Sequence, residues 1–148
     1  MVKLSIIIPT LDEAKVIAGT LARVRAFAPE AELIVADGGS QDGTAALAAQ
    51  ADPAARIIQA PRGRASQMNA GAAEAKGDWL LFLHADTQVP EGFAEEIAKA
   101  ARLGYQAGAF RLRIEGRHPL LPLLAWGATW RTRWRGIALG DQGLFLAA

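Results

Sequence analysis

The sequence predicts one α/β domain with a mainly parallel central sheet. Three observations carry this prediction: apolar strand-like runs alternate four times with helix-like segments, the loops between them are short, and 148 residues suit one domain. Apolar residues make up 51% of the chain and charged residues 21%, which excludes wholesale disorder and supplies a hydrophobic core. The whole chain, residues 1–148, is therefore expected to form a single domain.

Short apolar runs define the expected strands. Residues 4–8 include three consecutive isoleucines and stop at Pro9, a pattern typical of a buried strand. A later run, Trp79 to Leu83, is the most apolar of all. The strands expected in the first two thirds of the chain are residues 4–8, 33–36, 56–59 and 79–83.

Helices are expected between these strands. Thr10-Leu11-Asp12-Glu13 has the pattern of a capping box, with Thr10 as the cap and Glu13 reaching back, and apolar residues follow it at helical spacing. Gly71 lies within another expected helix, where glycine weakens the helix and so indicates close packing or a close approach. The expected helices run from the cap to residue 28, and over residues 43–50, 65–75 and 90–103.

The C-terminal third differs in charge from the rest of the chain. Residues 101–148 carry seven arginines against Glu115 and Asp141, although the net charge of the whole chain is only +1. Such a basic segment can face phosphates, acidic lipid or an acidic partner, and a solvated basic surface is an equally good interpretation.

A strand, a helix and a final strand are expected in this third. Residues 106–114 have a strand pattern, and the expected helix over residues 120–135 places Trp126, Trp130 and Trp134 on one stripe. Core packing is the favoured interpretation of that stripe; peripheral membrane contact and a lipid-linked acceptor are the alternatives. The apolar end, residues 143–148, is expected to form a strand that has one face uncovered or an edge open to a second chain, so oligomerisation, for example as a homodimer, or poor solubility is expected.

Polar and glycine residues follow each of the four strands. In a parallel α/β sheet, ligands bind beyond the carboxyl ends of the strands, so these segments are expected to form one binding site. The segments are residues 9–13, 37–40, 60–64 and 84–86.

Three of these segments carry groups that suit a nucleotide. Asp37, before two glycines, can accept hydrogen bonds from a base or a ribose, or it can simply cap the following turn. Arg62 and Arg64 flank a glycine before a helix, which suits a diphosphate, or they lie on a solvated loop. Asn69, on that helix, can touch a ligand or orient a neighbouring loop.

His84 and Asp86 form the sharpest feature of the sequence. They follow a buried strand and are two residues apart, so in an extended chain they point the same way. Mg²⁺ takes one or two carboxylates together with substrate phosphates, and imidazole also suits Mn²⁺-like ions. The pair is thus a candidate divalent-metal site, with ordinary loop residues as the alternative.

Together these motifs resemble glycosyltransferases of family two, which have the GT-A fold, a Rossmann-like three-layer sandwich. The resemblance rests on the segments Ser5–Glu13, Ile34–Thr44, Asn69–Gly71 and Ala75–Leu83, followed by His84-Ala85-Asp86-Thr87 at the family's Asp-x-Asp motif. The chain departs from the family pattern at Asp12 for asparagine, Gly38 for the second aspartate of a pair, and His84 for the first aspartate of the metal motif. The His84-Ala85-Asp86-Thr87 form and Gly140-Asp141-Gln142-Gly143 resemble a bacterial subgroup associated with radical-SAM or selenium-related gene clusters.

The resemblance implies inverting transfer of a sugar from a nucleotide-diphosphate sugar, most simply a UDP-sugar, to an unidentified acceptor. It implies a divalent cation, Mg²⁺ or Mn²⁺, at Asp86, with or without His84. Asp141 is the only acidic residue after Glu115 and is the candidate substitute base, whereas its position in the family pattern suggests a part of the acceptor-side or donor-side architecture instead. The nucleotide-sugar-binding residues that it implies are Pro9, Thr10, Glu13, Asp37, Gly39, Arg62, Arg64, Asn69 and Asp86.

The resemblance also implies an incomplete enzyme. Residues 1–100 match the nucleotide-sugar-binding half, residues 101–148 match the start of the acceptor-side half, and the family's Glu-Asp dipeptide with its catalytic base is absent. A donor-binding fragment is therefore one alternative, and a nucleotidyltransferase is another. The sequence lacks a Gly-x-Gly-x-x-Gly or Walker loop. No nucleic-acid partner is expected. The expected location is the cytoplasm, either free or peripheral to the inner face of the membrane.

Overall fold

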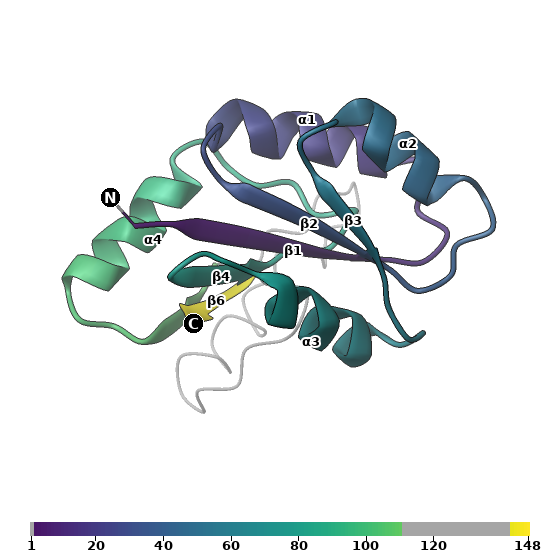
Figure 1. Ribbon diagram of the computed structural model, residues 1–148. Helices are drawn as coiled ribbons and strands as arrows, with labels where there is room; N and C mark the ends of the chain where they lie inside the picture. Colours follow the sequence, from purple (N-terminus) through teal and green to yellow (C-terminus); the bar gives the residue numbers. More distant parts are fainter. Residues whose placement is uncertain (1, 111–142) are drawn as a thin grey trace, which may run out of the picture.

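A six-stranded sheet forms the centre of the computed structural model, which describes residues 2–110 and 143–148 (Figure 1). The strand order is β3-β2-β1-β4-β6-β5, in which the first four strands are parallel and β6 is antiparallel to both β4 and β5. The prediction of a mainly parallel sheet is confirmed. The strands are β1 (Leu4–Thr10), β2 (Glu32–Asp37), β3 (Arg56–Gln59), β4 (Trp79–Phe82), β5 (Ala107–Ala109) and β6 (Leu144–Ala147).

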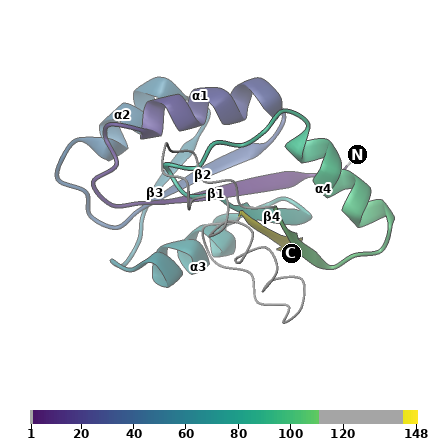
Figure 2. The same ribbon diagram turned by 180° about the vertical axis from the view of Figure 1, so that it is seen from behind.

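Helices cover both faces of this sheet, which gives the three layers that the sequence predicts. Figures 1 and 2 show α1 and α2 on one side of the sheet and α3 on the other. None of the helices in the described part of the chain is long and apolar enough to cross a membrane. The helices are α1 (Ile17–Phe27), α2 (Thr44–Ala51), α3 (Arg64–Glu74) and α4 (Phe93–Arg102).

Side-chain alternation along the strands builds two cores. Ile6 and Ile8 point into the larger core, which also contains the buried faces of α1 and α4, whereas Ile7 points into a smaller core beneath α3. This is the period of two that a strand imposes. Because β1 is buried on both faces, its middle residues Ile6–Ile8 form a continuous apolar run, as expected for a central parallel strand.

The capping box predicted at residues 10–13 is wrong. The β1–β2 ladder continues through the pair Thr10 and Asp37, so Thr10 belongs to the sheet and its hydroxyl donates to Asp37. The Glu13 N–H donates to Thr44 Oγ1 at 2.8 Å, and α1 begins only at Ile17. The ladder with β2 therefore outweighs the local helix-start signal.

The open edge predicted for residues 143–148 is also wrong. β6 lies between β4 and β5 and pairs with both, so within the described chain the sheet edges are β3 and β5. Phe145 is 9% exposed, and its ring centroid lies 6.0 Å from that of Trp79. The edge argument for a homodimer therefore does not hold. Of the strand predicted over residues 106–114, the described part forms β5, while the 120–135 helix lies outside the described residues.

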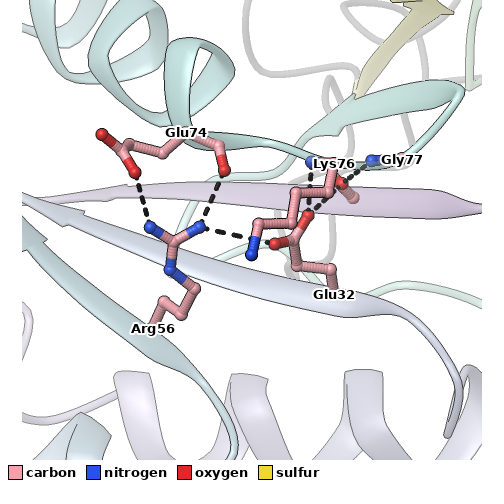
Figure 3. A network of polar contacts seen from close by, with 6 residues as sticks. Glu32, Arg56, Glu74, Lys76 and Gly77 are labelled. Carbon is pink, nitrogen blue, oxygen red and sulfur yellow. Dashed lines mark hydrogen bonds and ion pairs between the residues drawn. The ribbon is translucent and has the colours of Figure 1, made fainter.

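A polar network ties α3 to the amino end of the sheet (Figure 3). The Glu32 carboxylate accepts hydrogen bonds from Ser5 Oγ at 2.5 Å and from the Lys76 N–H at 2.8 Å. Arg56 Nη1 lies 3.6 Å from Glu32 Oε1, and Arg56 Nη2 lies 2.5 Å from Glu74 Oε2. The network joins β1, β2 and β3 to the segment after α3, at the end of the sheet opposite the carboxyl ends of the parallel strands.

We expect Glu32→Gln to lower the free energy of unfolding by about 1–2 kcal/mol at pH 7, because charge-assisted hydrogen bonds are lost. Burial alone would raise the pKa of Glu32, but the Ser5 and Lys76 hydrogen bonds and the Arg56 guanidinium together hold it below its usual 4.5. A lowered folded-state pKa stabilises the fold above the unfolded-state pKa, and this contribution is lost as the pH falls below about 4.5.

Urea unfolding at pH 7 and pH 3 measures this difference, with Glu30→Gln, an exposed glutamate in a turn, as the matched control. The difference in free energy of unfolding between wild type and Glu32→Gln should be smaller at pH 3 than at pH 7. A gap that stays constant with pH would show that the charge of Glu32 contributes nothing.

Candidate functional site

A cavity of about 280 Å³ opens at the carboxyl ends of the parallel strands. Three segments meet there: the end of β1, the loop and first turn of α3, and the loop after β4. Three of the four predicted strand-end segments are thus brought together. The lining residues are Pro9, Thr10, Leu11, Glu13, Arg62, Gly63, Arg64, Gln67, His84, Ala85 and Asp86.

Asp86 and His84 line the cavity from a turn. The Thr87 N–H donates to the His84 carbonyl at 3.0 Å, so residues 84–87 form a turn and not the extended chain that the sequence analysis assumed. Both side chains still reach the same cavity. The Asp86 carboxylate is exposed and accepts no hydrogen bond from any described residue, so it is available to a cation.

Helix α1 holds this turn and the loop after it in place. The Thr20 hydroxyl donates to the Ala85 carbonyl, and Arg23 Nε donates to the Val89 carbonyl at 2.7 Å. Ala85 and Val89 are themselves buried in the larger core. Asp86 is therefore an exposed carboxylate on a backbone that packing and hydrogen bonds fix from both sides.

Arg62 and Arg64 supply positive charge on another wall. Both are exposed, and neither forms an ion pair with a described residue. Arg64 is the first residue of α3, and Gly63 before it has φ 130°, a conformation that favours glycine. Two uncommitted guanidinium groups at a helix N-terminus suit an anion with several oxygens, such as a diphosphate.

Asp37 lies behind this cavity rather than in its wall. The side chain is buried, and its oxygens accept hydrogen bonds from Thr10 Oγ1, Ser40 Oγ, and the Gly39 and Ser40 N–H groups. Burial alone would raise the pKa of Asp37, but these hydrogen bonds together hold it below its usual value. Asp37 therefore caps the turn, as the simpler interpretation of the sequence had it, and lies one side chain away from the cavity through Thr10.

Hydrogen bonds join the loop after β2 to the loop after β1. Asp12, with φ 57°, accepts from the Gln41 N–H, and its own N–H donates to Ser40 Oγ at 2.9 Å. Asp42 accepts from the Ala14 N–H at 2.9 Å. Ser40, Asp42 and Thr44 were not predicted from the sequence to join these two loops, although short polar side chains in loops commonly bond nearby backbone groups.

Besides Asp37, two predicted site residues lie outside the cavity wall. Gly39 is exposed and adopts φ 92°, and Asn69 is exposed on α3. Gln67, by contrast, lines the cavity and was missed, because a glutamine within a helix carries no sequence signal of its own. Asp141 lies outside the described residues.

The described residues supply only some of the ligands that a divalent cation needs, so they fit a cation that a bound phosphate also ligates. Among the described residues no three histidine, aspartate or glutamate side chains group together, so the protein offers Asp86 with His84 nearby. Mg²⁺ and Mn²⁺ sites that handle nucleotides use one or two carboxylates and complete their shell with phosphate oxygens and water. Arg62 and Arg64 line the same cavity as Asp86 and His84.

The three-layer arrangement with a cavity at the carboxyl edge of its sheet is that of an α/β domain that binds ligands beyond its strand ends. The family model described as "Glycosyl transferase family 2" matches residues 5–133, and the chain belongs to this family.

Curated relatives are glycosyltransferases that are longer than this chain. A PGL/p-HBAD biosynthesis glycosyltransferase of Mycobacterium tuberculosis (strain H37Rv) is 39% identical over 103 residues, which cover 66% of this chain and 40% of the relative. An undecaprenyl-phosphate 4-deoxy-4-formamido-L-arabinose transferase of Photorhabdus laumondii is 30% identical, covering 99% of this chain and 48% of the relative. The chain thus spans less than half the length of these relatives.

Solved structures share the fold at low sequence identity. A mannosyltransferase of Pyrobaculum calidifontis in complex with GDP-Man and Mn²⁺ has a TM-score of 0.73 at 20% identity, covering 99% of this chain and 44% of the other. Glucosyl-3-phosphoglycerate synthase of Mycobacterium tuberculosis with Mn²⁺, UDP and phosphoglyceric acid has a TM-score of 0.72 at 21% identity, covering 99% and 56%. At these identities the likeness establishes the GT-A fold.

Proposed function

We propose that this chain is the donor-binding part of a glycosyltransferase and binds the diphosphate of a nucleotide sugar in the cavity. One observation carries the proposal: Asp86, Arg62 and Arg64 line the same 280 Å³ cavity, and no described residue neutralises them. A diphosphate bridging a cation at Asp86 to the two arginines would match these charges. The Mn²⁺ and Mg²⁺ complexes of fold neighbours with UDP or GDP-Man support this choice of ligand and cation.

The nucleoside is proposed to lie at the ends of β1 and β2. Pro9, Thr10 and Glu13 supply the near wall, and Asp37 lies directly behind Thr10. A carboxylate has about four acceptor positions, and four donors already occupy those of Asp37. A nucleotide base can therefore form a hydrogen bond with Asp37 only if it displaces one of these donors. The Ser40 hydroxyl can rotate away. Gly39 and Asn69 are proposed to contact the outer parts of the donor.

The proposed reaction is inverting transfer. An acceptor hydroxyl attacks the anomeric carbon, the bond from that carbon to the diphosphate oxygen breaks, and the nucleoside diphosphate leaves with the electron pair. A carboxylate takes the acceptor proton, and Asp141 is proposed as that base. Asp86, with His84 nearby, would hold a divalent cation, which would supply positive charge to the leaving diphosphate.

A lipid-linked acceptor is proposed from one relative and from the sequence. The Photorhabdus laumondii relative is named for an undecaprenyl-phosphate substrate, and the arginines and tryptophans of residues 111–135 suit contact with a membrane surface. We propose a cytoplasmic location, peripheral to the inner face of the membrane. Binding to anionic vesicles, followed by sedimentation, tests the membrane part of this proposal.

Two other functions remain as alternatives. A donor-binding chain without transfer would hydrolyse or merely hold the nucleotide sugar, and a nucleotidyltransferase would release pyrophosphate. Mass spectrometry of the products from a nucleotide-sugar panel separates all three, since only transfer yields a glycosylated acceptor together with free nucleoside diphosphate.

We expect Asp37→Ala to weaken UDP binding roughly tenfold, about 1.4 kcal/mol, because the turn it holds and its hydrogen bonds are lost. Calorimetry with UDP and Mn²⁺ measures this, and Asp37→Asn tests how much depends on the charge. Equal affinity of wild type and Asp37→Ala would remove Asp37 from the site.

For Asp141→Asn, we expect transfer by the purified chain to fall roughly 10²–10⁴-fold, as for loss of a general base, while the affinity for UDP stays unchanged. Single-turnover transfer assays measure the first quantity and calorimetry the second. Undiminished transfer in the variant would exclude Asp141 as the base.

A further inference from the structure

Gln67 is a buried polar side chain between α3 and the sheet. It is 3% exposed, and its Nε2 donates to the Thr10 carbonyl at 2.6 Å and to the Ala36 carbonyl at 2.9 Å. These carbonyls belong to the ends of two neighbouring strands, β1 and β2. One amide group therefore fastens the first turn of α3 to both strands at the edge of the cavity.

The space beside Gly38 is filled by the same side chain. A Cβ added at Gly38 would lie 3.0 Å from both Cδ and Nε2 of Gln67, closer than ordinary packing allows. The backbone of Gly38 does not have a positive φ, so its conformation would accept an L-residue. Gln67 could withdraw only by giving up its two hydrogen bonds to buried acceptors, which is costly. The nearest atoms that a side chain at position 38 would meet therefore belong to Gln67.

The position of Gln67 on α3 connects it to the charges of the site. Arg64 is one helical turn earlier on the same helix, and the Gln67 N–H donates to the Gly63 carbonyl at 2.9 Å. A shift of this turn relative to the strands would move the two arginines relative to Asp86 across the cavity. Gln67 is the polar contact between this turn and the strand ends that the described structure provides.

We propose that Gln67 is a positioning residue that fixes the phosphate-binding arginines relative to the nucleoside side of the cavity, and that Gly38 is glycine to make room for it. This inference rests on the proposed donor binding. It assigns Gln67 an effect on the diphosphate of the donor rather than on the nucleoside alone.

The first test compares two ligands on three proteins. Wild type, Gln67→Met and the control Gln50→Ala, an exposed helical glutamine, are titrated with UDP and with uridine in the presence of Mn²⁺. Methionine keeps the length of glutamine and removes the donor. We expect Gln67→Met to weaken UDP about tenfold and to leave uridine within about twofold, since only the diphosphate reaches the arginines.

The outcomes separate the two proposals. Wild type that binds no UDP would overturn the proposed donor binding itself. The other outcomes concern a wild type that binds UDP. If Gln67→Met binds UDP equally well, or loses affinity for UDP and uridine by the same factor, the positioning role is overturned and donor binding stands.

A second test uses stability and needs no ligand. Gly38→Ala should lower the melting temperature by several degrees in the wild-type background and by less than about one degree in a Gln67→Ala background, because the obstructing side chain is gone. Gly19→Ala, where a Cβ meets no atom within 4 Å, is the matched control. An equal loss in both backgrounds would overturn the pairing of Gly38 with Gln67, even if Gln67→Met did not fold.

Discussion

Replacing Asp86 with asparagine is expected to abolish the metal-dependent part of nucleoside-diphosphate binding. The Asp86 carboxylate is exposed in the cavity and has no described hydrogen-bond partner, so its charge is available to a cation. Loss of an outer-sphere partner already costs a metal site roughly 10–100-fold in affinity. Loss of a direct carboxylate ligand should cost at least as much, and the fold should be unaffected because the side chain is exposed.

Calorimetric titration with UDP, with and without Mn²⁺, measures this effect. His84→Ala is expected to lose less than Asp86→Asn, because Mg²⁺ and Mn²⁺ favour carboxylate oxygen over imidazole. Asp78→Asn is the matched control, since Asp78 is an exposed aspartate before β4, at the other end of that strand. Wild-type affinity that is indifferent to a chelator would show that the cation assignment is wrong.

The second large effect is expected from Gly71→Ala, which should destabilise the fold by about 1–3 kcal/mol, the usual cost of overpacking. Gly71 is buried on α3, and an added Cβ would collide with Ile7 Cγ2 and lie 3.2 Å from Ile7 Cγ1. Ile7 is fully buried in the central strand and has no room to retreat. The helix must therefore move away from the sheet or deform.

Gly19→Ala is the matched control, because Gly19 is also helical but has open space around its Cα. Relief of glycine's conformational entropy should stabilise this variant by roughly 0.5–1 kcal/mol. Urea unfolding of both variants measures the contrast. If Gly71→Ala proved as stable as Gly19→Ala, the contact between α3 and β1 would be looser than the structure shows.

Local sequence determined most of the architecture. The continuous apolar run at Ile6–Ile8 predicted a strand buried on both faces, and Gly71 indicated a close approach of α3 that the contact with Ile7 confirms. These features depend on the periodicity of apolar residues and on the absence of a side chain at glycine, and both can be recognised from the amino-acid sequence alone. The same holds for the gathering of polar residues at strand ends, because parallel topology places those ends on one edge.

Tertiary structure decided what local signals could not. Thr10 has the sequence context of a helix cap, but pairing with β2 makes it a strand residue bonded to Asp37. Residues 144–147 look like an edge strand, yet they lie between β4 and β5, because strand order depends on which backbone groups find partners across the whole sheet. Gln67 is an unremarkable helical glutamine in the sequence. Only the approach of α3 to the ends of β1 and β2 buries its amide, and a buried amide must find acceptors, which here are the carbonyls of Thr10 and Ala36.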